Sequence, residues 1–402
     1  MNASNRQQSD AAARTRQPIR IDTSGLRAES YLRADVSASA VRHNLGLLRR
    51  CLTPGVKLCA VVKADCYGHG QDLLLDLLSG GADFLAVATP EEALHLRSRG
   101  YTGPILVFFS ACAYANGKEL QEAVAELIAR KVTLTVAQPE EIAAVAAAAA
   151  VVDAPAEVHV KVDSGMTRSG VLPDQAPAMF QALRSEKRIR LTGIYTHFAT
   201  ADAGDKAFTL QQLERFQEVV DAAGARDVCL HAANSAATID LPVTHLDMVR
   251  PGIALYGYAP SDEMHNDLPL QPCLRLTAKL MQVKDVPAGS QAGYGRTFTF
   301  DADARVGLVP VGYGDGYLRC LGGQATMRVR GVDVPIRGRV AMDQTLIDLS
   351  AVPEASVGDE VEIISPQPNA PHSVANLARL AGTIPYEVTC RLGSRVRRRR
   401  VE

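Results

Sequence analysis

Short apolar runs alternate with helical patterns along most of the first 260 residues. Each run is too short for a helix, leads into a turn and is followed in most cases by apolar positions at helical spacing. The eight runs occupy residues 57–63, 84–88, 105–109, 133–137, 157–163, 191–198, 228–234 and 246–252. Alternating strands and helices predict a parallel sheet, and eight units predict a closed (β/α)₈ (TIM) barrel. An open, doubly wound sheet is the alternative, but it rarely contains eight evenly spaced units.

The pattern changes after Tyr258. A polar linker containing proline, residues 259–272, precedes short β-type runs broken by Gly, Pro and Asp, and no long helical pattern returns before residues 373–382. This predicts an α/β protein whose N-terminal barrel is followed by a C-terminal, mostly-β domain. We expect a disordered tail over residues 1–30, the barrel over 31–262 and the β domain over 263–402. The basic segment 394–402 is expected to be a solvated terminus, with a weak contact to an anion as the alternative.

Composition narrows the function classes. With 402 residues, 47% hydrophobic and 22% charged, the chain is typical of a globular protein with two well-buried cores. A net charge of −1, 5% aromatic residues and no Trp argue against nucleic-acid binding and against an anionic membrane surface. No apolar run is long enough to span a bilayer, and the N-terminus has no signal-peptide core. We therefore expect a cytoplasmic protein.

The cysteines agree with a reducing compartment. They are scattered, they never form a C-x-x-C pair, and some fall inside predicted core strands. We interpret them as free thiols and not as a disulfide framework or a zinc site. The eight residues are Cys51, Cys59, Cys66, Cys112, Cys229, Cys273, Cys320 and Cys390.

Polar residues gather where the predicted strands end, which is where a (β/α)₈ barrel places its active site. Taken singly, each has an ordinary explanation: a lysine reaching into water, a hydrogen-bonded core histidine, a helix N-cap for Ser235 or an ion pair for an arginine. Their coincidence on one end of the barrel favours a functional site instead. The residues are Lys63, Tyr67, Asp163, Arg168, His197, Asn234, Ser235 and Arg250.

The chemistry available to this group is limited. A partly desolvated lysine such as Lys63 can attack a carbonyl and form a Schiff base. Ser235 and the backbone N–H groups after the eighth strand fit the phosphate site common in barrels. A reactive lysine beside a phosphate site suggests pyridoxal 5′-phosphate (PLP) as the cofactor. No His and carboxylate cluster has metal-ligand spacing, so we expect no metal, and no G-x-S-x-G elbow is present.

Several blocks resemble the alanine racemase family of PLP enzymes (fold type III) and follow the family's order over residues 30 to 395. The first, AVVKADCYGHG at 60–70, is similar to the family's PLP-lysine signature. Eight ordered blocks at compatible spacing make the resemblance highly specific. The others are KVDSGMTRSG, THFA, HAANSAA, VRPGIALYG, AGYGRTF, GRVAMDQ and IPYEVTCRLGSR.

The resemblance implies a role for each matching residue. Lys63 would hold PLP and serve as one catalytic base, and Tyr294 of a partner chain would be the second. Arg250 would bond the pyridine nitrogen. The phosphate would be held by Tyr67, Ser235, Gly252, Ile253 and Tyr386. His197 would lie against the cofactor, Arg168 would touch its phenolic oxygen and the substrate, Met342 would contact the substrate carboxylate, and Lys161 matches a position that can be carbamylated.

The family also implies the reaction and the assembly. We expect interconversion of L- and D-alanine, which supplies D-alanine for peptidoglycan, in a head-to-tail homodimer whose sites combine one barrel with the partner's β domain. Lysine and tyrosine have ordinary pKa values of about 10.4 and 10, so both must be lowered to act near neutrality. Asp65 and Cys66 stand where the family often has Asn and Ala, and neither change removes a role.

Three other functions stay open from the sequence. A broad-specificity or serine racemase would share the fold, and an apolar pocket excludes one added hydroxyl poorly. Tyr386 is the residue type expected for alanine preference. An amino-acid decarboxylase would lack the AGYGRTF and HAANSAA blocks. A non-catalytic PLP-binding barrel would lack the β domain and Tyr294.

Overall fold

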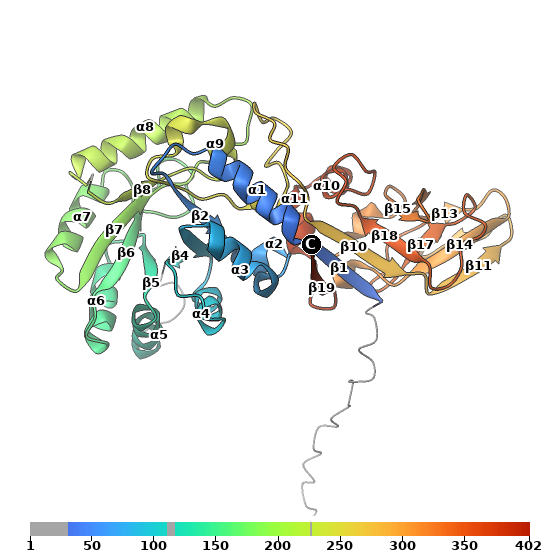
Figure 1. Cartoon of the computed structure of the whole chain (residues 1–402), viewed down its shortest axis with the longest axis horizontal. Helices are drawn as coiled ribbons and strands as arrows, with labels where there is room; N and C mark the ends of the chain where they lie inside the picture. The colour runs from blue at the N-terminus through green and yellow to red at the C-terminus, as the bar shows by residue number, and fades with distance from the viewer. Residues whose placement is uncertain (1–30, 111–116, 226) are drawn as a thin grey trace, which may run out of the picture.

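The computed structural model describes residues 31–110, 117–225 and 227–402. The predicted tail at 1–30 and Cys112 lie outside the described residues. Figure 1 shows a barrel with helices around it on one side and a β-rich part on the other. The predicted fold class, a (β/α)₈ barrel followed by a mostly-β region, is confirmed. The exact boundaries at 262 and 263 stay a prediction.

Eight parallel strands form the barrel in the order β8-β7-β6-β5-β4-β3-β2-β9. The barrel closes between β8 and β9. There Asp247 N–H donates to Leu230 O at 3.0 Å and Arg250 N–H donates to Ala233 O at 2.9 Å. All eight predicted runs became strands: β2 Lys57–Val61, β3 Phe84–Val87, β4 Ile105–Ser110, β5 Val132–Val136, β6 Ala156–Lys161, β7 Ile189–Tyr195, β8 Cys229–His231 and β9 Met248–Val249.

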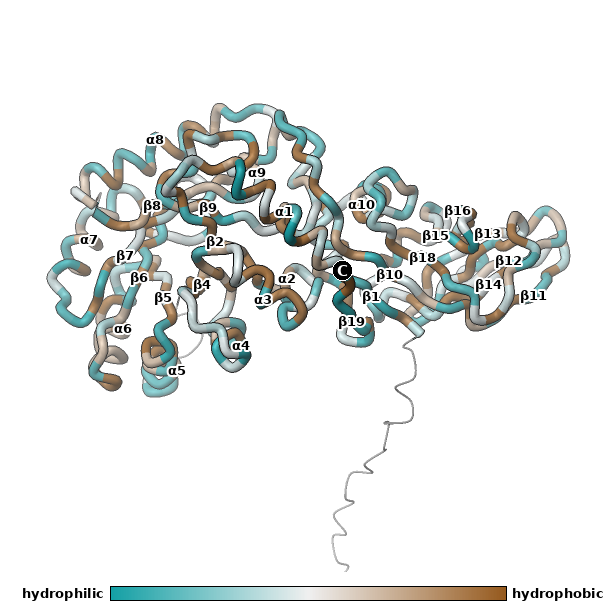
Figure 2. Tube along the Cα trace, viewed as in Figure 1, coloured by the Kyte–Doolittle hydropathy of each residue, from teal (hydrophilic) through white to brown (hydrophobic). Residues whose placement is uncertain are grey.

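Helices cover the outside of the barrel. Helix α4 begins with a capping box, in which Thr89 Oγ1 accepts from Glu92 N–H while the Glu92 carboxylate accepts from Thr89 N–H, and Pro90 fills its first position. Along these helices brown and teal alternate in Figure 2, as expected where one face lies on a core. The helices are α1 Ala38–Arg50, α3 Gln71–Gly81, α4 Pro90–Ser98, α5 Gly117–Ala129, α6 Glu141–Val151, α7 Ala176–Ser185, α8 Ala207–Ala222 and α9 Ser235–Asp240.

The second part contains a six-stranded sheet in the order β16-β15-β18-β10-β1-β19 and a three-stranded sheet in the order β11-β14-β17. The strands are β10 Leu274–Lys279, β11 Gln282–Val286, β12 Gln291–Ala292, β13 Phe298–Thr299, β14 Ala304–Val309, β15 Thr326–Val329, β16 Val332–Pro335, β17 Thr345–Asp348 and β18 Glu360–Ile364. Two helices follow, α10 Val374–Ala381 and α11 Pro385–Cys390.

Both ends of the described chain meet in this six-stranded sheet. Strand β1 (Leu32–Ser37) precedes the barrel, yet it pairs antiparallel with β10 and parallel with β19 (Arg397–Val401). Its alternate residues Leu32, Ala34 and Val36 are fully buried, so β1 behaves as a half-buried strand of period two. The prediction that the basic segment 394–402 is a solvated terminus was wrong, because four of its arginines lie in β19.

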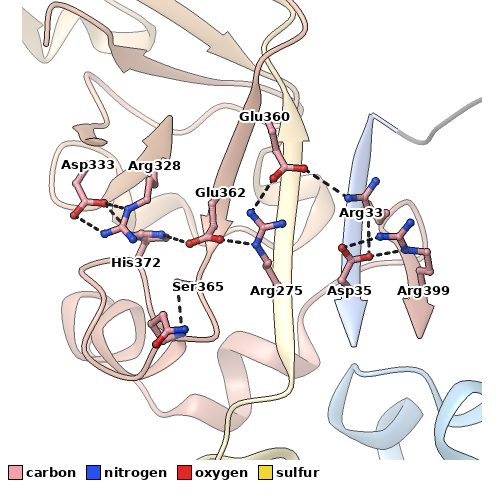
Figure 3. Close-up of polar contacts among 11 residues, drawn as sticks. Arg33, Asp35, Arg275, Arg328, Asp333, Glu360, Glu362, Ser365, His372 and Arg399 are labelled. Carbon is pink, nitrogen blue, oxygen red and sulfur yellow. Dashed lines mark hydrogen bonds and ion pairs between the residues drawn. The ribbon is translucent and has the colours of Figure 1, made fainter. Parts of the chain in front are cut away.

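Ion pairs run across one face of this sheet from β16 to β19, as Figure 3 shows. Glu362 on β18 is central: its carboxylate accepts from Arg275 Nε at 2.5 Å and from Nε2 of the buried His372 at 3.0 Å. Arg275 also bonds Glu360 at 2.8 Å. Towards the edges, Arg328 pairs with Asp333, Arg33 with Glu360 and Asp35, and Arg399 with Asp35. These pairs connect strands that are far apart in the sequence.

Replacing Glu362 should destabilise the sheet in a pH-dependent way. Although burial raises it, the hydrogen bonds from Arg275 and His372 hold the pKa of the Glu362 carboxyl below its ordinary value. Its contribution is therefore complete above about pH 4.3 and is lost as pH falls through the lower pKa of the folded state. We expect Glu362→Gln to cost about 1–3 kcal/mol at pH 7 and less in acid. Urea unfolding at several pH values measures this.

Glu360→Gln is the matched control. Glu360 lies on the same strand, but its side chain is 48% exposed, against 13% for Glu362. An exposed pair contributes about 0–1 kcal/mol, so this variant should lose much less stability. Equal losses for the two variants, or a Glu362→Gln loss that does not change with pH, would contradict the assignment.

Candidate active site

Lys63 begins a short turn, α2 (Lys63–Tyr67), directly after β2. The four residues from Ala64 to Tyr67 all have positive φ, between 51° and 55°. None of them is glycine, and the left-handed conformation costs such residues about 1–2 kcal/mol each. Strain of this kind persists where surrounding contacts hold it, often at functional sites. The turn therefore requires strong external support.

Hydrogen bonds from outside the turn provide part of this support. Glu92 Oε1, on the neighbouring helix α4, accepts from Ala64 N–H at 2.6 Å. Asp65 accepts twice, through its side chain from Gln71 N–H at 2.6 Å and through its carbonyl from Gly70 N–H at 2.9 Å. Sequence reasoning did not find the role of Glu92, since it shows in the sequence only as the N3 residue of a capping box.

Arg250, just after β9, is buried and held by neutral acceptors. Its Nη2 donates to Thr196 O at 2.8 Å and to Ala232 O at 3.0 Å, and its Nη1 donates to His231 Nδ1 at 2.8 Å. The guanidinium lies 5.3 Å from the centroid of the Tyr195 ring. Burial lowers the pKa of Arg250 to about 10, so it remains charged at neutral pH.

Two histidines extend inward from Arg250. Because a guanidinium only donates, His231 Nδ1 must accept, which places the His231 proton on Nε2. That proton points to Nδ1 of His159, 2.9 Å away. Burial and the charge of Arg250 lower the pKa of both imidazoles, that of His159 to about 3, so both are neutral. Sequence reasoning missed this chain, although each histidine is a polar residue within a predicted apolar strand.

A cradle of hydroxyl and backbone N–H groups lies after β8 and β9. The N-cap of α9 is Asn234 and not Ser235, because Asn234 Oδ1 accepts from Ala237 N–H at 3.0 Å. The Ser235 hydroxyl instead accepts from Gly252 N–H at 2.8 Å, which leaves its own proton to donate. A side chain at Gly252 would overlap the Tyr67 hydroxyl, so glycine permits this close approach.

The cradle has a third side. The ring of Tyr386, on α11, lies 5.9 Å from that of Tyr67. Ile253 opens the short 3₁₀ turn 253–256, and the first N–H groups of such a turn have no acceptor within it. Hydroxyl and backbone N–H donors converging in this way suit a phosphate group.

Burial and neighbouring positive charge lower the pKa values of several groups at this end of the barrel. Burial and then Arg168 lower the pKa of the Lys63 amine, while Glu92 opposes the shift. Burial, Arg168 and Arg250 lower the pKa of Lys161 to about 8, and Lys161 Nζ donates to Ser169 Oγ at 2.6 Å. Burial and the same arginines lower the pKa of His197 well below its ordinary value. The amines of Lys63 and Lys161 therefore lose their protons more readily than those of exposed lysines.

Asp163 shapes the loop that carries Arg168. Its two carboxylate oxygens accept from the N–H groups of Gly165, Thr167 and Arg168 at 3.0 to 3.1 Å. Thr167 has φ of 57°, so the loop turns sharply just before the arginine. The exposed Arg168 thus follows a rigid turn at the end of β6.

Tyr294 and Met342 lie elsewhere in the chain. Tyr294 sits between β12 and β13, which Figure 2 shows in the part of the β-rich region away from the barrel. It is 73% exposed, and Met342 is 53% exposed. Met342 O accepts from Gly314 N–H at 2.8 Å, next to the exposed Tyr313. Within one chain, Tyr294 therefore lies in the β-rich part, whereas Lys63 follows barrel strand β2.

The fold and the strand-end residues define a lysine-centred (β/α)₈ enzyme with a C-terminal β region. Across the described ranges, no group of three or more His, Cys, Asp or Glu side chains is arranged to hold a metal ion. In the same ranges no helix is both long and apolar enough to cross a membrane. The seven described cysteines are free, as predicted.

Two family models match the chain: "Alanine racemase, N-terminal domain" over residues 36–260 and "Alanine racemase, C-terminal domain" over residues 273–400. The chain belongs to the alanine racemase family. It is 41% identical over 373 residues to the alanine racemase of Desulfovibrio desulfuricans, covering 92% of this chain and 98% of that protein. To the alanine racemase of Methanococcus maripaludis it is 37% identical over 371 residues, covering 91% and 97%.

Solved structures agree with this assignment. The alanine racemase from D-cycloserine-producing Streptomyces lavendulae has a TM-score of 0.86 at 34% identity, covering 93% of this chain and 98% of that one. The biosynthetic alanine racemase from Pseudomonas aeruginosa has a TM-score of 0.80 at 37% identity, covering 93% and 100%. The similarity therefore extends over the barrel and the β-rich part together.

Proposed function

We propose that this protein is a PLP-dependent racemase that interconverts L- and D-alanine and supplies D-alanine for peptidoglycan in the cytoplasm. The observation that carries the proposal is the position of Lys63. Its amine, with a lowered pKa, begins a strained turn at the same barrel end as Arg250 and the donor cradle around Ser235. A reactive amine beside a phosphate-type cradle fits PLP.

The residues present suit each part of the cofactor. Tyr67, Ser235, Tyr386 and the N–H groups of the 252–253 segment would hold the phosphate. Lys63 would hold the aldehyde carbon, Arg250 would donate to the pyridine nitrogen, and Arg168 would donate to the phenolic oxygen. When bound, PLP supplies a conjugated ring that withdraws electrons from the α-carbon of an attached amino acid. His197, kept neutral by burial and by its cationic neighbours, would lie beside the ring.

Racemisation requires a proton acceptor and a proton donor on opposite faces of the α-carbon. Lys63 would serve one face, since its lowered pKa makes the neutral amine more accessible than in an exposed lysine. Tyr294 would serve the other face, with Met342 beside the substrate carboxylate. Because Tyr294 is exposed on the β-rich part of its own chain, we assign this role to Tyr294 of a second copy. The active unit would be a head-to-tail homodimer.

Circular dichroism of amino-acid solutions tests the activity directly. Purified protein with PLP should abolish the signal of L-alanine, and Lys63→Ala should remove both this activity and the visible absorbance of the bound cofactor. L-serine serves as the specificity probe, and its signal should fall much more slowly. Unchanged signals for both amino acids would overturn the racemase proposal, and equal rates would replace it with a broad-specificity racemase.

Mixing two inactive variants tests the shared site. Lys63→Ala and Tyr294→Phe homodimers should each be nearly inactive with L-alanine. After subunit exchange, half of the dimers should be mixed, and one of their two sites would combine an intact Lys63 with an intact Tyr294. The mixture should recover about a quarter of wild-type activity. If each chain used its own Tyr294, mixing would restore nothing.

We also propose that Lys161 carries a carbamate. Its pKa of about 8 leaves about a tenth of the side chain as free amine at pH 7, far more than for an exposed lysine. The ammonium would first lose one proton, and the neutral amine nitrogen would then bond to the carbon of CO₂ and release a second proton to solvent. The two steps together replace a positive charge with a negative one beside Arg168. Such a change would relieve the repulsion among cations at this end of the barrel.

Carbon-13 NMR after incubation with labelled bicarbonate should show a carbamate signal in the wild-type protein and none in Lys161→Gln. Lys206 is an internal control, because it is also buried but pairs with Asp240 at 2.8 Å and should not react. A signal that survives in Lys161→Gln, or the absence of any signal in the wild type, would rule out this modification.

A further inference from the structure

Arg398 reaches from the last strand of the chain to the turn that follows Lys63. Its side chain is only 13% exposed, although it lies within a run of four arginines in β19. Its Nε donates to the carbonyl oxygen of Gly68 at 2.7 Å and lies 3.7 Å from Asp65 Oδ2. The guanidinium therefore contacts the left-handed turn directly.

The other side of the same guanidinium binds the chain that follows α11. Nη1 donates to Gly393 O and Val396 O, each at 3.0 Å, and Nη2 donates to Leu392 O at 2.6 Å. Tyr386 lies on α11, just before this segment. One planar group thus connects the turn that carries Lys63 and Tyr67 to the helix that carries Tyr386.

Backbone contacts make this connection close. Gly68, with φ of 83°, approaches Thr389 so closely that a side chain there would overlap the Thr389 carbonyl oxygen. The turn before Gly68 is left-handed at four non-glycine residues and needs external bonds to persist. Arginine suits the position because its rigid fork presents several donors to diverging acceptors, whereas a lysine ammonium is a compact point charge on a flexible stem.

We propose that Arg398 is a positioning residue for Lys63: by bonding Gly68 and the 392–396 backbone together, it holds the left-handed turn and keeps Tyr386 against Tyr67. This inference rests on the proposed role of Lys63 in binding PLP. It also gives the β-rich part a role within its own chain, in addition to supplying Tyr294 to a partner. The neighbouring Arg397, which is exposed on the opposite face of β19, should have no such role.

Hydrogen exchange of the cofactor-free protein tests the turn without any measurement of activity. In Arg398→Gln, peptides covering residues 63–71 should exchange on the order of 10-fold faster than in the wild type, while peptides from the barrel strand β6 should not change. The matched control Arg397→Gln should behave as the wild type. Unchanged exchange at 63–71 in Arg398→Gln, or equal acceleration in both variants, would overturn the proposal.

Arg398→Lys keeps the test decisive if Arg398→Gln does not fold. A lysine retains the charge but cannot hold all of these acceptors at once, so its exchange at 63–71 should lie between those of the wild type and Arg398→Gln. Wild-type exchange at 63–71 in the folded Arg398→Lys protein would reject the proposal.

In the holoenzyme, Arg398→Gln should also lower kcat for L-alanine by roughly 10-fold, with a smaller change in KM, because a misplaced amine slows proton transfer more than binding. Arg397→Gln should keep wild-type kcat. If the wild type binds no PLP and racemises no alanine, the proposed function fails, while the exchange experiment still decides whether Arg398 holds the turn. A wild-type kcat in Arg398→Gln would show that the contact does not position Lys63.

Discussion

Four basic side chains, Lys63, Lys161, Arg168 and Arg250, share the carboxyl end of the barrel, where burial and their mutual repulsion together disfavour further positive charge. Arg250 is buried and keeps its charge, which disfavours a second positive charge on the imidazoles around it. Burial first, and then the charge of Arg168, lower the pKa values of Lys63 and Lys161. Burial first, and then the charge of Arg250, keep His197, His231 and His159 neutral. Such an arrangement favours anions, which fits a phosphate-bearing cofactor and an amino-acid carboxylate.

The second constraint is the strained turn after Lys63, and it makes the two parts of the chain depend on each other. The barrel contributes Glu92 to the turn, and the β-rich part contributes Arg398 and the close contact at Thr389. Strand β19 is held in this position in part by its pairing with β1, which precedes the barrel in sequence. The geometry at Lys63 therefore depends on residues more than 300 positions away.

The sequence predicts the barrel well because its signal is local. Each run such as 133–137 lies between turn and helix signals, and parallel order follows from the alternation alone. The strand ends then predicted that Lys63, Ser235 and Arg250 share one end of the barrel. The sequence could not predict pairings between distant segments, or which of two neighbouring polar side chains makes a given hydrogen bond. The parallel pairing of β1 with β19 leaves no local signal, and either Asn234 or Ser235 could have capped α9.

The acceptors around Arg250 explain why its charge remains available to a ligand. Its hydrogen-bond partners in the described chain are backbone carbonyls and imidazoles, with no carboxylate among them. A carboxylate would neutralise the guanidinium, whereas neutral acceptors satisfy its protons and leave its field intact. The same holds deeper in the barrel, where His231 and His159 are neutral. A protonated His231 could not accept a hydrogen bond from Arg250. The barrel interior therefore fixes both the direction and the charge of the group expected to face the pyridine nitrogen.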